Sequence, residues 1–178
     1  MWQTILKYGL IAGLVVAIPM NVMILATPSH LPLAYGMVFG YVTMLVALSA
    51  VFVAIKRYRD AELGGVIGFW PALALGLGIS LIAGIIYSLA WELSLVLSHA
   101  DFATAYANTL IAEKKAAGAS AEAIAKLTAE MDTFKVQYAN PLYRMPMTFA
   151  EIFPVGVLVS LISAALLRNR RFLAVRHA

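Results

Sequence analysis

The stretch FWPALALGLGISLIAGIIYSLAWELSLVL, residues 69–97, contains a single charged side chain, Glu92. A helix needs about 20 apolar residues to cross a hydrocarbon core of about 30 Å, and this stretch exceeds that length. Because no water reaches the backbone in lipid, each amide must find its partner within its own segment. The stretch is therefore predicted to be a membrane-spanning helix.

Three more stretches have the same character, namely residues 4–26, 32–55 and 147–167. The whole chain is 62% hydrophobic and only 12% charged, against about 25% charged in a soluble domain. The first stretch is longer than the apolar core of about 7–15 residues in a signal peptide, so we expect a retained helix. The predicted fold class is all-α: an integral membrane four-helix bundle, with one domain over residues 1–178.

Residues 98–146 separate the third and fourth spans and are predicted to form an extra-cytoplasmic helical hairpin. Gly118-Ala119-Ser120 breaks the segment into two halves, and Ser120 is a suitable N-cap for the second half. Apolar residues then recur at spacings of three and four, which is typical of one helix face: Ile124, Leu127, Met131, Phe134 and Tyr138. A weaker stripe in the first half holds Phe102, Tyr106 and Leu110. The stripes either pack together or form a docking surface for a partner or the membrane surface.

Basic residues cluster at two helix ends, after the second span and after the fourth: Lys56, Arg57, Arg59, Arg168, Arg170, Arg171 and Arg176. Short loops rich in Lys and Arg stay in the cytoplasm. Both termini are therefore predicted to be cytoplasmic, with the turn at residues 27–31 and the segment 98–146 outside. The same clustering explains the net charge of +4 without a nucleic-acid partner. Lys56, Arg57 and Arg59 are predicted either to contact anionic lipid headgroups or only to set the topology.

Small residues recur every four positions in two spans and predict close helix contacts. The first span carries Gly9, Gly13 and Ala17, and the third carries Ala72, Gly76, Ser80, Gly84 and Ser88. The first and third helices are therefore expected to approach each other closely.

These two lines of small residues end in polar side chains, Asn21 and Glu92. Glu151 enters the fourth span at a similar depth, and Tyr87 and Trp91 project nearby. A carboxylate in a bilayer costs roughly 2.5–3.5 kcal/mol on insertion scales, so it usually faces the bundle or a water-filled cavity. The five residues are predicted to form a ligand-binding pocket in the outer leaflet.

A structural interpretation of the two carboxylates stays open. Glu92 and Glu151 would then sit at the membrane interface, either solvated or hydrogen-bonded to Arg144, Tyr87 or the backbone.

Other site chemistry finds little support in the chain. There are no cysteines, and the three histidines lack ligand spacing. No nucleophile motif accompanies the carboxylates. We therefore predict no catalytic residues, no metal and no cofactor.

Several local patterns resemble one known family. They are Tyr8-Gly9 with Gly13, the run from Phe52 to Asp60 with the pair Gly64-Gly65, and Trp91-Glu92 after Ile85-Ile86-Tyr87. Together they are similar to the small four-span bacterial membrane proteins grouped as domain of unknown function 4199. The resemblance implies a bacterial inner-membrane protein. It supplies no activity and no functional positions.

Two classes of function follow as expectations. The first is a non-enzymatic envelope accessory or scaffold protein whose hairpin meets an envelope protein partner. The second is a protein that binds or transports a lipid or a small cationic solute through the polar pocket. The expected partners are membrane lipid and, beyond it, a second copy of the chain in a homo-oligomer or an envelope protein.

Overall fold

The computed structural model describes residues 1–26, 33–99 and 101–173, and within them the chain is all-α. The six helices follow in order along the chain: α1 Trp2–Ala26, α2 Leu33–Glu62, α3 Phe69–Ser98, α4 Phe102–Ala116, α5 Ala121–Tyr138 and α6 Pro141–Leu167. The predicted turn at residues 27–31 and the predicted cation Arg176 lie outside the described residues.

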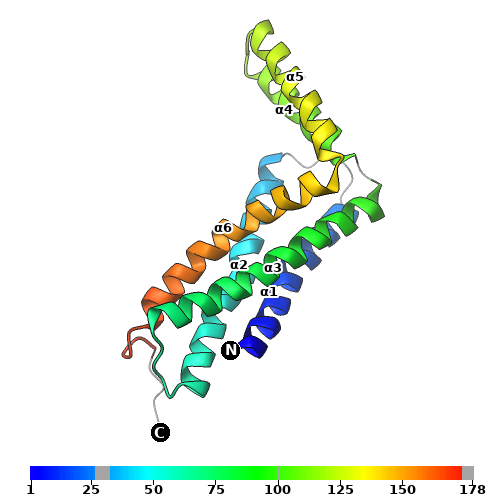
Figure 1. Ribbon diagram of the computed structural model, residues 1–178. Helices are drawn as coiled ribbons and strands as arrows, with labels where there is room; N and C mark the ends of the chain where they lie inside the picture. The colour runs from blue at the N-terminus through cyan, green and yellow to red at the C-terminus, as the bar shows by residue number, and fades with distance from the viewer. Residues whose placement is uncertain (27–32, 100, 174–178) are drawn as a thin grey trace.

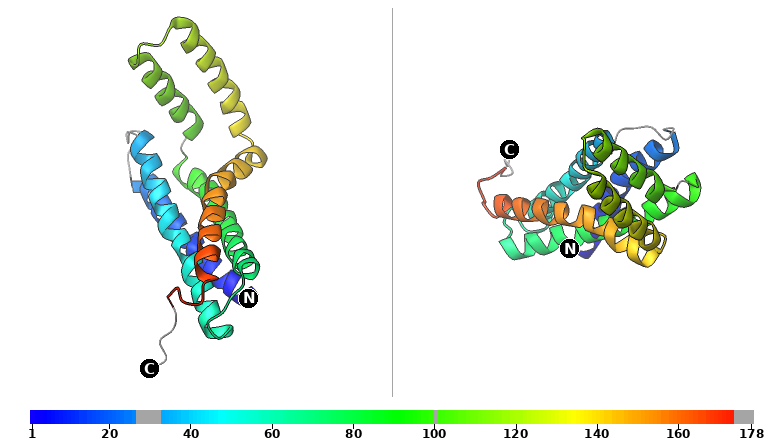
Figure 2. Two further views of the ribbon diagram at one scale, coloured as in Figure 1. Left: turned by 90° about the vertical axis from the view of Figure 1, so that its left-hand side faces the viewer. Right: turned by 90° about the horizontal axis from the view of Figure 1, so that it is seen from above.

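Four of these helices, α1, α2, α3 and α6, are long and apolar enough to cross a membrane. They form one elongated bundle, and the hairpin of α4 and α5 projects from one end of it (Figure 1). We call this the hairpin end. The N-terminus, the loop between α2 and α3 and residues 168–173 lie at the opposite end, which we call the tail end (Figure 2). The chain is therefore a multi-pass membrane protein with a helical bundle fold.

The spans extend farthest beyond their predicted boundaries at the end of α2 and at the start of α6. The helix α2 runs through the basic residues to Glu62, although the apolar stretch ends near residue 55. The helix α6 starts at Pro141 and not at residue 147, because Asn140 caps it and proline is tolerated in the first turn. Hydropathy alone misses both extensions, since helix ends depend on caps and not on polarity.

The hairpin forms as the sequence predicts. The Ser120 hydroxyl accepts a hydrogen bond from the backbone N–H of Ala123 (3.2 Å). Gly118 turns the chain with a φ of +73°, a conformation that other residues rarely adopt. The two stripes face each other, since the rings of Tyr106 and Phe134 lie 5.7 Å apart. The two stripes thus pack together, which is the first of the two predicted alternatives.

The first and third helices approach closely, as predicted. A Cβ atom added to Gly9 would lie 2.7 Å from Ile82 Cβ, and one added to Gly13 would lie 2.7 Å from Ile86 Cβ. Real Cβ atoms do not approach this closely, so both positions require glycine unless the helices move apart.

The small-residue line of α3, however, packs against α6 and not against α1. A Cβ on Gly76 would lie 2.8 Å from Ser160 Cβ, and one on Gly156 would lie 2.6 Å from Ser80 Cβ. Each glycine thus receives the serine of the opposite helix, and the two serine hydroxyls lie 3.3 Å apart. The helix α3 therefore uses two different faces, one for α1 and one for α6, and forms the centre of the bundle.

Candidate functional site at the hairpin end

A cavity of about 460 Å³ lies at the hairpin end, between the bundle and the base of the hairpin. All six helices contribute to its wall. Most of the surface is apolar or aromatic, with methionines from α1 and four rings from the hairpin, namely Phe102, Tyr106, Phe134 and Tyr138. The hairpin thus covers the cavity with its aromatic stripe.

Three of the five predicted pocket residues line this cavity, namely Tyr87, Trp91 and Glu151. The Tyr87 hydroxyl donates a long hydrogen bond of 3.4 Å to Glu151 Oε2. The Trp91 indole N–H donates to the Tyr138 hydroxyl at 2.7 Å and ties α3 to α5. The structure therefore brings a carboxylate, an indole and two phenols to one place.

Glu92 is placed differently, because it forms an ion pair with Arg144. The Arg144 Nε atom donates to Glu92 Oε1 at 2.7 Å, and Nη2 donates to Oε2. The third nitrogen, Nη1, donates to the Tyr138 carbonyl at 2.9 Å. Glu92 is not among the residues that line the cavity. It instead anchors the junction of α5 and α6, as the structural interpretation of this carboxylate expects.

Asn21 lies on a different surface, between α1 and α3. Its side-chain carbonyl accepts a hydrogen bond from the Ser94 hydroxyl at 2.8 Å. It borders a groove of about 710 Å³ whose wall is otherwise apolar. Ile18 and Leu93 in this groove are more than half exposed, so the groove belongs to the outer surface of the bundle. The predicted convergence of Asn21 with the two carboxylates is therefore not what the structure shows.

The charge of the cavity wall comes from one residue. Among the described residues that line the cavity, Glu151 is the one with a formal charge. Burial raises the pKa of Tyr138 to about 12, so its hydroxyl stays neutral at physiological pH. Among the described lining residues the cavity therefore holds one carboxyl group, polar hydroxyls and no basic side chain.

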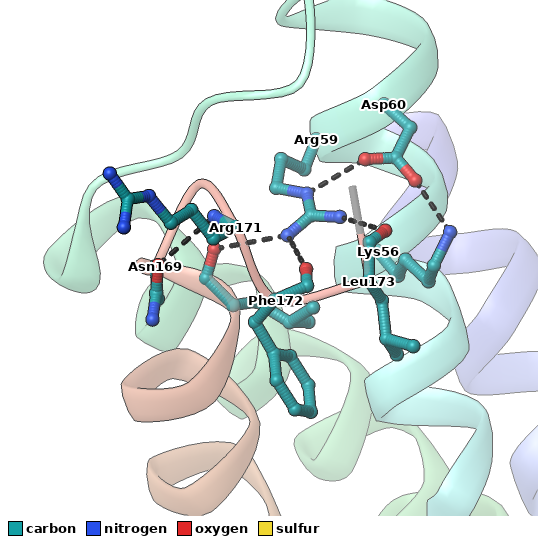
Figure 3. Close-up of polar contacts among 8 residues, drawn as sticks. Lys56, Arg59, Asp60, Asn169, Arg171, Phe172 and Leu173 are labelled. Atoms are coloured by element: carbon teal, nitrogen blue, oxygen red, sulfur yellow. Dashed lines mark hydrogen bonds and ion pairs between the residues drawn. The ribbon is translucent and has the colours of Figure 1, made fainter. Parts of the chain in front are cut away.

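The three predicted headgroup residues near the tail end differ from one another, and Figure 3 shows the contacts of two of them, Lys56 and Arg59. Arg59 is fully buried. It therefore does not face lipid headgroups, contrary to the prediction. Its guanidinium donates to Asp60 at 2.7 Å and to the carbonyls of Phe172 and Leu173 at 3.0 Å each. Lys56 also pairs with Asp60, at 2.7 Å. Arg57 alone of the three is exposed, so the headgroup hypothesis stays a prediction that rests on this residue.

A family model described as a protein of unknown function, DUF4199, matches residues 7–169. The chain belongs to the DUF4199 family. The match includes every residue that lines the cavity and both members of the ion pair between Glu92 and Arg144. No curated protein and no solved structure matches the chain.

The hairpin residues of the site were assigned to packing stripes in the sequence of this DUF4199 protein. Tyr106, Phe134 and Tyr138 do pack on one another, but they also line the cavity. One signal was present: aromatic residues gather at the membrane-proximal ends of both stripes. Aromatic rings at that level are typical of a membrane interface, and they do not by themselves indicate a cavity.

No metal site is evident in the described part of this DUF4199 protein. Within residues 1–26, 33–99 and 101–173, no three histidine or acidic side chains gather closely enough to hold an ion.

Proposed function

We propose that this protein binds an amphiphilic small molecule in the cavity at the hairpin end. The observation that carries the proposal is the cavity itself, about 460 Å³ in volume and walled by aromatic residues around one carboxylate. Ligand sites typically measure about 300–1,000 Å³, with mostly apolar walls and a few polar groups that orient the ligand. The cavity fits this description.

The exposure of the wall residues supports entry from the side of the bundle. Phe39 and Tyr41 of α2 are 44% and 50% exposed, and Met147 of α6 is 40% exposed. All three also line the cavity. The hairpin-end halves of α2 and α6 diverge toward the hairpin, as the left view of Figure 2 shows. An opening between these helices would admit a ligand from the membrane or from its interface.

For the orientation, we propose a bacterial inner membrane with both termini in the cytoplasm and the hairpin outside. Lys56, Arg57 and Arg59 at the tail end support it, together with the arginines that follow α6. The chain has no cysteine, so single cysteines can report the topology. Ser120→Cys should react with an impermeant maleimide in intact cells, and Leu63→Cys should react only after lysis. The reverse pattern would invert the proposed orientation.

A cavity-filling substitution tests the binding proposal. Gly40 lines the cavity, and a Cβ added there would meet nothing within 4 Å. Gly40→Phe should therefore fill the space without displacing a helix. Val46→Phe is the matched control, because Val46 is on the same helix and 59% exposed.

The measurement is lipid retention by native mass spectrometry after release from nanodiscs of phosphatidylethanolamine and phosphatidylglycerol. We expect Gly40→Phe to retain less lipid than the wild type and Val46→Phe. Equal retention by all three proteins would count against an occupied cavity.

The accessory or scaffold role and the homo-oligomer stay predictions. The hairpin stripe on which the scaffold role depended is half-buried against α4, and its ring Phe134 also lines the cavity. The face predicted to meet an envelope protein partner is thus already in use within the chain. For this reason the binding proposal takes first place.

A further inference from the structure

We infer that the ligand of the cavity is an organic cation, an ammonium group with an apolar substituent, whose charge is held at Glu151 and the surrounding rings. This inference rests on the proposed binding function and names the chemical class of its ligand. Three features of the site support it: Glu151 has few hydrogen-bond donors, the cavity wall is aromatic, and Arg144 is already paired with Glu92.

The carboxylate of Glu151 has little compensation within the protein. Its one hydrogen-bond donor among the described residues is the Tyr87 hydroxyl, at 3.4 Å from Oε2. No donor reaches Oε1 within the described part of the chain, and no described lining residue is basic. Glu151 is exposed at the wall of a mostly apolar cavity, and a carboxylate that faces such a cavity within a membrane is costly unless it is paired. A cationic ligand would supply the missing partner.

Arg144 does not fill that role, although it lies near the site. Its guanidinium carbon is 5.4 Å from the centre of the Tyr138 ring. Its Nε and Nη2 atoms donate to Glu92, and its Nη1 atom donates to the Tyr138 carbonyl. The three guanidinium nitrogens of Arg144 are thus used, and its charge is balanced by Glu92. Arg144 therefore does not balance the carboxylate of Glu151.

The aromatic wall favours the same class of ligand. Tyr87, Trp91 and Tyr138 line the cavity together with Glu151, and Tyr87 and Tyr138 are 7% and 6% exposed. The face of an aromatic ring attracts a cation, and aromatic cages are a recurring way to bind quaternary ammonium groups. The apolar wall formed by Met20, Met44 and Leu95 would receive the substituent.

The chain offers an internal reporter for a binding experiment. Trp91 lines the cavity, whereas Trp2 and Trp70 are 66% and 75% exposed. Replacing both by phenylalanine leaves Trp91 as the single source of indole fluorescence. The purified protein in uncharged maltoside micelles is titrated with benzyltrimethylammonium or with neopentylbenzene, its uncharged carbon isostere. The same titrations are repeated on Glu151→Gln and on Glu130→Gln, a control that removes an exposed hairpin charge.

Benzyltrimethylammonium is expected to bind at least about tenfold more tightly than neopentylbenzene, a ratio that Glu151→Gln abolishes and Glu130→Gln preserves. Circular dichroism and the melting temperature show whether Glu151→Gln is still folded. Glu151→Asp, which keeps the charge, should recover part of the preference. Equal binding of both probes, or an unchanged preference in folded Glu151→Gln, would overturn the inference.

The Gly40→Phe variant separates this inference from the proposed function. If both probes bind equally and Gly40→Phe weakens both, the cavity binds ligands but does not select cations. If neither probe responds to Gly40→Phe, the binding proposal itself fails.

Competition then identifies the source of the cation. Displacement of the probe by phosphatidylethanolamine and not by phosphatidylglycerol would indicate a lipid headgroup, and displacement by neither would indicate a free solute. Either result supports the cation class. Displacement by both lipids equally would contradict it, because the lipids share only their apolar and phosphate parts.

Discussion

The two ends of the bundle place a charged side chain in opposite surroundings, since Arg59 is buried and Glu151 is exposed. At the tail end, Arg59 is fully buried and donates to Asp60 and to two backbone carbonyls of the chain end. At the hairpin end, Glu151 lines a cavity and receives one long hydrogen bond. A charge with all its partners within the protein stabilises the fold, because its removal leaves other groups unpaired. A charge with few partners, such as Glu151, is what the proposed binding site requires.

The largest expected effect is at Arg59. Arg59→Met removes a buried cation, takes one of two donors from Asp60, which keeps Lys56, and leaves the carbonyls of residues 172 and 173 without the donor that Arg59 supplies. We expect the free energy of unfolding in mixed micelles to fall by about 3 kcal/mol. Arg57→Met, at an exposed neighbouring position, should cost less than about 0.5 kcal/mol. Equal losses of unfolding free energy in the two variants would show that the contacts of Arg59 do not specifically stabilise the tail end.

The next largest effect is expected at the contact between α3 and α6. A Cβ on Gly84 would lie 2.6 Å from the Phe149 ring, so Gly84→Leu should overpack the contact between α3 and α6. We expect a loss of about 1–3 kcal/mol, measured in the same unfolding titration. Ala74→Leu adds the same side chain at an exposed position of α3 and should be neutral. A neutral Gly84→Leu would mean that the Phe149 ring moves aside freely.

A third comparison lies within the hairpin end, between its two carboxylates. Glu92→Gln removes the charge that Arg144 binds through two nitrogens, and it should cost about 2 kcal/mol of unfolding free energy. Glu151→Gln should not lower the stability of the ligand-free protein and should raise it slightly, since it removes a poorly paired charge, and the long hydrogen bond from Tyr87 can persist with an amide. If Glu151→Gln is instead the more damaging change, Glu151 is structural and the contrast between the ends disappears.

The smallest expected effect is at the start of the hairpin. Hydrogen bonding to the Thr104 side chain and, second, to the Thr104 backbone N–H, which donates to the Asp101 carboxylate at 3.0 Å, lowers the pKa of Asp101. Asp101→Ala should cost about 1 kcal/mol at neutral pH, as the loss of an N-cap does.

The pH dependence of that loss follows from the direction of the shift. A lowered folded pKa means that Asp101 stabilises the hairpin above its unfolded pKa of about 3.9 and loses this contribution as the pH falls through the folded value. The difference in melting temperature between wild type and Asp101→Ala should therefore shrink at about pH 2. A difference that persists there would assign the loss to something other than the ionised cap.

The sequence by itself determined the spans and the hairpin, and it singled out three residues that line the cavity. Membrane helices follow from continuous hydropathy, and the break at Gly118 and the cap at Ser120 act within a few residues. Tyr87, Trp91 and Glu151 stand out in the sequence because each is a polar or amphipathic side chain within a span; the structure places them at the cavity wall, and their role in binding stays a prediction.

Only the tertiary structure decided which partner each side chain meets. Glu92 pairs with Arg144 across 52 residues, Arg59 reaches the chain end across 113, and Asn21 turns away from the cavity toward Ser94. The small-residue line of α3 packs against α6, while a different face of α3 packs against the glycines of α1. Depth along a span is readable from a sequence, but the rotation of each helix about its axis is set by packing against its neighbours. That rotation decides whether a charged side chain pairs within the protein, as Arg59 does, or lines a cavity, as Glu151 does.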